Sequence, residues 1–125
     1  MSPKVSVLAS AKKQGRKVLS ARQYLHAIEL VKQLADFNDP AAVADLRIEP
    51  IEDFYELKDK GGLLGKINLR IYFGYFPKLN EIVVVHVYKK EQECQLPRHI
   101  IITVQARIRN YRNGGLRNGM TVYEA

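Results

Sequence analysis

The sequence INLRIYF at residues 67–73 decides the predicted fold, because its apolar and polar residues alternate. Alternation with a period of two is typical of a β-strand that buries one face. The run FYELK at residues 54–58 alternates in the same way, and IVVVHVY at 82–88 is apolar on both faces, as in a central strand. Glycines at 61–62 and the segment PKLN at 77–80 supply the turns between these runs. The pattern therefore predicts an antiparallel meander.

Helical spacing occurs on both sides of the meander. It predicts an amphipathic helix from about Ser20, a suitable N-cap, to Phe37, and a short second helix over residues 41–46 after a proline break. A last helix is predicted from Pro97 to the glycines at 114–115. The fold class expected is α+β, with an N-terminal helical hairpin packed on a small antiparallel β-sheet and a C-terminal basic helix.

The length of 125 residues indicates one domain. Residues 1–18 show no sustained period and are rich in Lys and Arg, so they are predicted to form a basic, flexible N-terminal segment. The folded domain is predicted over residues 19–113, and 114–125 are predicted as a C-terminal tail.

The formal net charge of +7 is unevenly distributed along the chain. Cations dominate residues 1–33 and 97–118, whereas acids dominate residues 36–56. Such segregation creates a directional field that suits a polyanionic partner such as RNA, although solubility alone also explains a basic protein. Ordinary solubility and RNA binding both remain open on charge alone.

Several classes of protein are disfavoured by the composition. No apolar run approaches the ~20 residues that span a bilayer, so no membrane contact is expected. Cys94 is the single cysteine, which fits a reducing cytoplasm and predicts a cytoplasmic protein. No metal and no cofactor are expected, because Cys94 and the histidines at 26, 86 and 99 lack metal-ligand spacing.

Strand alternation predicts which side chains share a sheet face. If the helical hairpin covers the apolar face, that face holds Tyr55, Leu57, Ile67, Leu69, Ile71, Val83, Val85 and Val87. The opposite face then holds Lys58, Asn68, Arg70, Tyr72, His86 and Tyr88. This second set combines cations, an imidazole and phenols on neighbouring strands.

That combination suits RNA cleavage that uses the 2′-hydroxyl as nucleophile. The reaction needs a base, an acid for the leaving 5′-oxygen and fixed cations for the phosphate charge. Arg70 and Lys58 would stabilise the phosphate, and His86 or Tyr88 would carry protons. Tyr72 would stack on bases. The structural alternatives are that His86 is a core histidine, that the tyrosines serve only the strands, and that the arginine-rich last helix is a solvated surface.

The quoted motifs resemble a known family. ELK at residues 56–58, LRIYF at 69–73, IVVVHVYKK at 82–90 and Pro97 opening a helix that contains Ala106 are similar to the phage-derived, HigB-like branch of the RelE/ParE toxin superfamily. The resemblance covers roughly residues 20–112.

The resemblance implies a RelE-like fold, an mRNA endoribonuclease activity on the ribosome, and inhibition by an antitoxin protein. It points to Lys58, where the family often has Arg, and to Arg70 and His86 as site residues. It also points to Lys89 and Lys90 as RNA contacts. The cations of the last helix would grip the RNA backbone; they are Arg98, Arg107, Arg109 and Arg112.

Three hypotheses follow for the function. The first is a toxin endoribonuclease, for which Arg70→Ala is expected to abolish activity with little change in thermal unfolding. The second is a non-catalytic module that binds nucleic acid or protein on the same scaffold, as the gyrase-directed branch implies for its members. The third is a phage-associated protein that kept the fold and lost the chemistry.

Overall fold

The structure is a computed structural model that describes residues 2–90 and 95–123. Within these residues the chain is an α+β protein with three α-helices and a six-stranded mixed sheet. The elements in chain order are β1 (Lys4–Val7), α1 (Ala9–Val18), α2 (Ala21–Lys32), η1 (Gln33–Asp36), β2 (Arg47–Ile51), β3 (Phe54–Asp59), η2 (Gly62–Leu64), β4 (Leu69–Phe76), β5 (Glu81–Lys89), α3 (Arg98–Arg112) and β6 (Thr121–Tyr123).

The sheet has the strand order β2-β3-β4-β5-β1-β6. Strands β3 to β5 form the predicted antiparallel meander, and β2, which was not predicted, pairs antiparallel with β3. Strand β1 pairs with β5 in parallel, and β6 pairs with β1 antiparallel at the edge. The last strand of the meander, β5, therefore lies beside β1, which precedes it by more than seventy residues in the chain.

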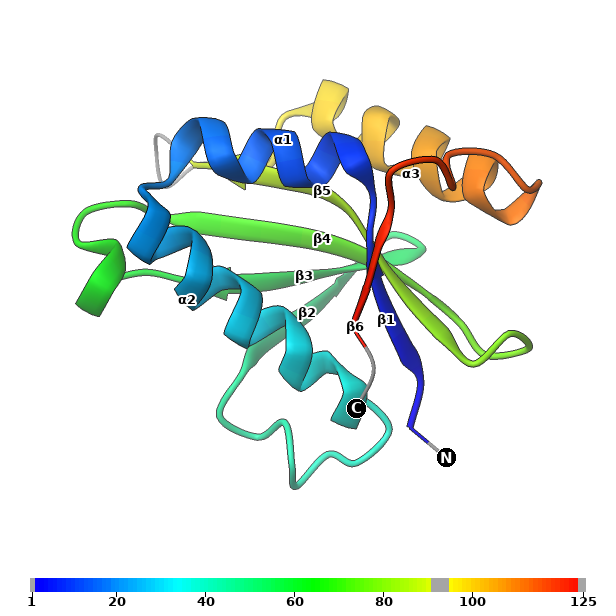
Figure 1. Cartoon of the computed structure of the whole chain (residues 1–125), viewed down its shortest axis with the longest axis horizontal. Helices are drawn as coiled ribbons and strands as arrows, with labels where there is room; N and C mark the ends of the chain where they lie inside the picture. Colours follow the sequence, from blue (N-terminus) through cyan, green and yellow to red (C-terminus); the bar gives the residue numbers. More distant parts are fainter. Residues whose placement is uncertain (1, 91–94, 124–125) are drawn as a thin grey trace.

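Helices cover both faces of the sheet. Figure 1 shows α1 along β5 and α2 in front of the meander, with α3 behind. On the front face the ring of Phe37, just after η1, contacts Tyr55 and Phe73. On the other face a Cβ at Gly74 would meet Ile108 of α3 at 3.3 Å, so glycine at this position permits the close approach of α3. The core therefore lies in two layers, one on each side of the sheet.

The helix predicted from Ser20 is confirmed as α2 with η1. The Ser20 hydroxyl accepts a hydrogen bond from the Gln23 backbone N–H (3.2 Å), and the Gln23 side chain accepts from the Ser20 N–H (2.9 Å). This capping box satisfies two backbone donors at the start of the helix. Strands β3, β4 and β5 and helix α3 also form where the sequence predicts them, within a few residues.

Two predictions at the N-terminal side are wrong. The first segment is part of the folded domain: residues 4–7 form β1, which lies inside the sheet, and residues 9–18 form α1. The predicted helix at 41–46 is a series of turns, and the Asp39 side chain accepts a hydrogen bond from the Ala41 N–H (3.1 Å) at their start. Such a short segment gains too few hydrogen bonds to offset helix nucleation. The helical hairpin is therefore α1 and α2.

A bulge in β5 changes which valines face the hairpin. His86 lies opposite Tyr72, but Val84 lies opposite Phe73, so Val85 is the extra residue. Val84 and Val87 therefore line the α1–α2 side, and the prediction that Val83 lies there is wrong, because Val83 pairs with Gly74 on the α3 side. His86 keeps its predicted face because the bulge precedes it.

Among the described residues, none of the helices has the length and apolar character needed to cross a membrane.

Candidate functional site

Pairing across β2 to β5 arranges the polar face in two rows. The outer row is Arg47, Lys58, Arg70 and Tyr88, each directly opposite the next on the neighbouring strand. The inner row is Glu49, Glu56, Tyr72 and His86, paired in the same way. The structure thus brings the predicted Lys58, Arg70, Tyr72, His86 and Tyr88 together on one face. Sequence reasoning missed Arg47, Glu49 and Glu56.

Three of the four residues of the inner row, Glu56, Tyr72 and His86, are buried, whereas Glu49 is exposed. Glu56 and Tyr72 are buried, and the Tyr72 hydroxyl donates to Glu56 Oε2 at 2.8 Å. Burial, together with that carboxylate, raises the pKa of Tyr72 far above its ordinary value. Tyr72 therefore holds its proton, and with no exposed surface it has no face to offer a base. The prediction that Tyr72 stacks on RNA is wrong.

His86 is also buried, with an exposed fraction of 6%. Its Nδ1 lies 3.0 Å from Arg107 Nη1 and 3.1 Å from Gln14 Nε2. A guanidinium can only donate, so Nδ1 must accept and the imidazole is neutral. Burial, then the charges of Arg107 and His99, lowers the pKa of His86 to about 4. The structure does not support His86 as the predicted proton carrier.

The contacts of His86 belong to a cap on the edge of β5. Strand β1 pairs only with residues 81–84, so the rest of β5 lacks a strand neighbour on that side. Gln14 Oε1 accepts from the Val87 N–H (3.2 Å), and Arg107 Nη1 donates to the Val85 carbonyl (2.8 Å). Arg107 also donates to Gln14 Oε1 at 3.3 Å, and burial lowers the pKa of its guanidinium. Arg107 thus stabilises the edge of β5, whereas the sequence predicted it as an RNA contact.

The low pKa of His86 predicts a loss of stability in acid. An unfolded His86, with a pKa near 6.5, binds a proton more readily than the folded one, with a pKa of about 4. Its contribution to stability is therefore complete above pH 6.5 and is lost as the pH falls from 6.5 to 4. We expect the free energy of unfolding, measured in urea, to fall by about 1–2 kcal/mol between pH 7 and pH 5.

The control for this prediction is His86→Gln, which removes the titrating ring. The variant should show a flatter pH dependence over the same interval. Equal pH dependence in the two proteins would remove His86 as the cause.

Arg70 is a fixed cation at the centre of the outer row. It is only 6% exposed, its Nη1 donates to Asn68 Oδ1 and to the Leu69 carbonyl (3.3 Å), and its Nε lies 3.7 Å from Glu56 Oε2. Because Glu56 also accepts from Tyr72, one buried carboxylate joins the two rows. The position of the guanidinium is thereby set before any ligand arrives.

Lys58 is more accessible than Arg70. Its Nζ donates to Glu49 Oε1 at 2.5 Å, and the side chains are 17% and 56% exposed respectively. This hydrogen bond, more than any other cause, lowers the pKa of Glu49. Arg47 is exposed and lies opposite Lys58. The alternation of Arg47, Ile48 and Glu49 is the local signal for β2, which was not used in the prediction from sequence.

The remaining predicted RNA contacts lie elsewhere on the surface. Lys89 is exposed but pairs with Leu69, which puts it on the hairpin face, and Lys90 follows β5. Arg98, Arg109 and Arg112 are exposed on α3, and the Arg112 guanidinium lies 5.6 Å from the centre of the Phe76 ring. Cys94 lies outside the described residues. Lys89 and Arg112 are thereby separated from the outer row, on the opposite face and near Phe76 respectively.

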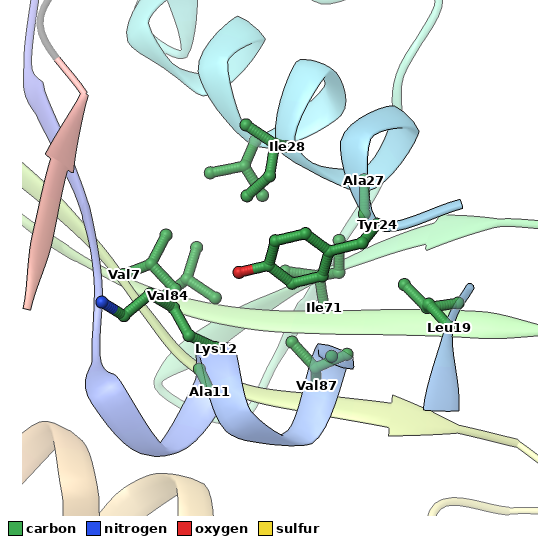
Figure 2. Close-up of a pocket in the computed structure, with 12 residues that line it drawn as sticks. Val7, Ala11, Lys12, Leu19, Tyr24, Ala27, Ile28, Ile71, Val84 and Val87 are labelled. Atoms are coloured by element: carbon green, nitrogen blue, oxygen red, sulfur yellow. The ribbon is translucent and has the colours of Figure 1, made fainter. Parts of the chain in front are cut away.

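The space between α1, α2 and the sheet offers no site for a substrate. Figure 2 shows the Tyr24 ring and apolar side chains of both helices meeting over Ile71, Val84 and Val87. The cavity left there is about 20 Å³, room for about one water molecule. Within residues 2–90 and 95–123, His, Cys, Asp and Glu form no group that could hold a metal ion.

Comparison with protein-family models finds no match to this chain, and none of the curated proteins matches it.

Proposed function

We propose that the protein binds RNA at the outer row and acts as a RelE/HigB-type toxin, an mRNA endoribonuclease that works on the ribosome. The observation that carries the proposal is the line of Arg47, Lys58 and Arg70 across three adjacent strands. The fold elements support it: a helical hairpin lies on one face of the antiparallel meander and an arginine-rich helix follows it. The proposal includes an antitoxin protein that binds this protein and inhibits it.

Like charges placed directly opposite each other on neighbouring strands destabilise a sheet. Arg47, Lys58 and Arg70 form such a line, and Glu49 and Glu56 offset only part of its charge. An anionic ligand relieves the remaining repulsion. With strands about 4.8 Å apart, the row from β2 to β5 extends over about 14 Å, a length that suits a nucleic-acid backbone.

In the proposed reaction the 2′-oxygen attacks phosphorus, its proton passes to a base, and the bond to the 5′-oxygen breaks as that oxygen gains a proton. Lys58 and the fixed Arg70 stabilise the charge on the phosphate. Tyr88, which is half-buried at the end of the row, is the proton carrier that remains once His86 is assigned to the fold.

A second candidate is the non-catalytic module on the same scaffold. It is favoured by the burial of Tyr72 and His86, because Tyr72 keeps its proton and His86 is neutral and hydrogen-bonded to Arg107. In that case Arg47 and Lys58 bind an anionic partner without chemistry.

The proposal predicts that Arg47→Gln with Lys58→Gln lowers the affinity for a fluorescent single-stranded RNA by about tenfold at 50 mM salt. The slope of log affinity against log salt should become shallower by about 1.4 if two phosphate contacts are lost. Fluorescence anisotropy over a salt series measures both quantities. Circular dichroism checks that the variant is folded.

Lys78→Gln is the matched control, because Lys78 is an exposed cation in the β4–β5 turn, away from the row. An equal loss of affinity in the control contradicts the outer row as the site. Incubating mRNA with the protein and ribosomes, and resolving the products on a gel, separates the two candidates. New 5′-hydroxyl ends support the nuclease, and binding without products supports the module.

A further inference from the structure

Glu49 places a carboxylate among the cations of the outer row. It lies on β2, the edge strand of the sheet, directly opposite Glu56. Its Oε1 accepts a hydrogen bond from Lys58 Nζ at 2.5 Å. Arg47 and Arg70 are also near enough to act on Glu49 electrostatically. Glu49 is thus an anion held by the cations proposed to bind phosphate.

The two carboxylates of the inner row differ in how firmly they are held. Glu56 is 5% exposed and is fixed by Tyr72 and Arg70. The Glu49 side chain is 56% exposed, and among the residues that the structure describes only Lys58 is close enough to form an ion pair with it. An ion pair this exposed contributes little to stability, so swinging the Glu49 side chain into water costs little. Glu49 can leave its place, and Glu56 cannot.

We infer that Glu49 occupies the position of a phosphate beside Lys58, so that RNA must displace this carboxylate before it reaches the outer row. The inference rests on the proposed RNA binding. Glu49 then competes with phosphate for Lys58 and weakens the binding of any RNA. It also favours ligands that carry enough phosphates to replace the carboxylate. The exchange breaks the Glu49–Lys58 ion pair and forms a phosphate–Lys58 ion pair.

The test is a double-mutant cycle on RNA affinity. Glu49→Gln keeps the shape of the side chain and removes its charge, and should raise the affinity for single-stranded RNA about three- to fivefold at 50 mM salt. Glu52→Gln removes a charge from the exposed turn after the same strand and should raise it by less than about twofold. Each variant is also made in a Lys58→Gln background, where the gain from Glu49→Gln should disappear.

The outcomes separate this inference from the function on which it rests. Equal gains from Glu49→Gln and Glu52→Gln overturn the inference, because general charge then explains both. A gain that persists without Lys58 overturns it too, as does no gain at all in a protein that binds RNA. If neither the unaltered protein nor Glu49→Gln binds RNA, the proposed function fails together with the inference.

Discussion

Replacing Arg70 with alanine is expected to lower the free energy of unfolding by about 3–5 kcal/mol. The guanidinium is almost fully buried and is the cationic partner of Glu56, which is 5% exposed. Its removal leaves a carboxylate in the interior with only the Tyr72 hydroxyl as a partner. Chemical denaturation at pH 7 measures the loss. For a domain of 125 residues the transition midpoint should shift clearly.

The control is Arg70→Met combined with Glu56→Gln, which removes both charges and keeps the volume. This pair should recover much of the stability, because the uncompensated charge is the main cost. A loss below about 1 kcal/mol in Arg70→Ala would show that water reaches Glu56 and that the pair is not sealed.

This result has a consequence for tests of catalysis. The sequence led us to expect that Arg70→Ala removes activity and leaves thermal unfolding nearly unchanged. The burial of Arg70 contradicts that expectation. Lost activity in Arg70→Ala then reports on folding as well as chemistry, which is why Arg47 and Lys58 are the better probes of the site.

Replacing Arg107 with alanine is expected to lower the free energy of unfolding by about 2–3 kcal/mol. One guanidinium nitrogen donates to the Val85 carbonyl, to His86 and to Gln14, so its loss uncaps the free edge of β5. Charge-assisted hydrogen bonds in a partly buried position are worth more than neutral ones. Urea denaturation of the variant measures the effect.

Arg109→Ala is the matched control, since Arg109 is exposed on the same helix. Its effect on stability should stay within about 0.5 kcal/mol. Equal stability of the two variants would mean that solvent replaces Arg107 at the β5 edge.

Local patterns predicted the elements that carry their own signal. Strand β4 alternates, and Ser20 and Gln23 form the box that begins α2. Helix α1 escaped prediction because its buried positions include Ala11 and Gly15, which give no apolar stripe. Small residues are needed there: a Cβ on Gly15 would lie 3.0 Å from the Tyr24 ring.

The missed strands have another cause. Strand β1 is stabilised by parallel pairing with residues 81–84, a contact that no local period reveals. Strand β2 contains Pro50, which is tolerated because β2 lies at the sheet edge. Strand β6 is too short to show a period.

The candidate site was predicted in part for the same reasons. Alternation placed Lys58, Arg70 and His86 on one face, and the register confirms it. Alternation does not say which face a later helix covers. Helix α3 was expected to bury Ile108, but its packing over Gly74 depends on where the chain crosses after β5. The burial of His86 and its contact with Arg107 depend on that packing of α3.

The pairing of β1 with both β5 and β6 affects how the chain folds during its synthesis. Strand β1 is held between β5 and β6, which are both translated much later than β1. Pairings this distant in sequence slow folding, and the half-made chain keeps an unpaired strand that is prone to aggregate. A nascent chain that stops before residue 81 lacks the partner on which β1 aligns, so a complete sheet, and any activity that needs it, arises only late in translation.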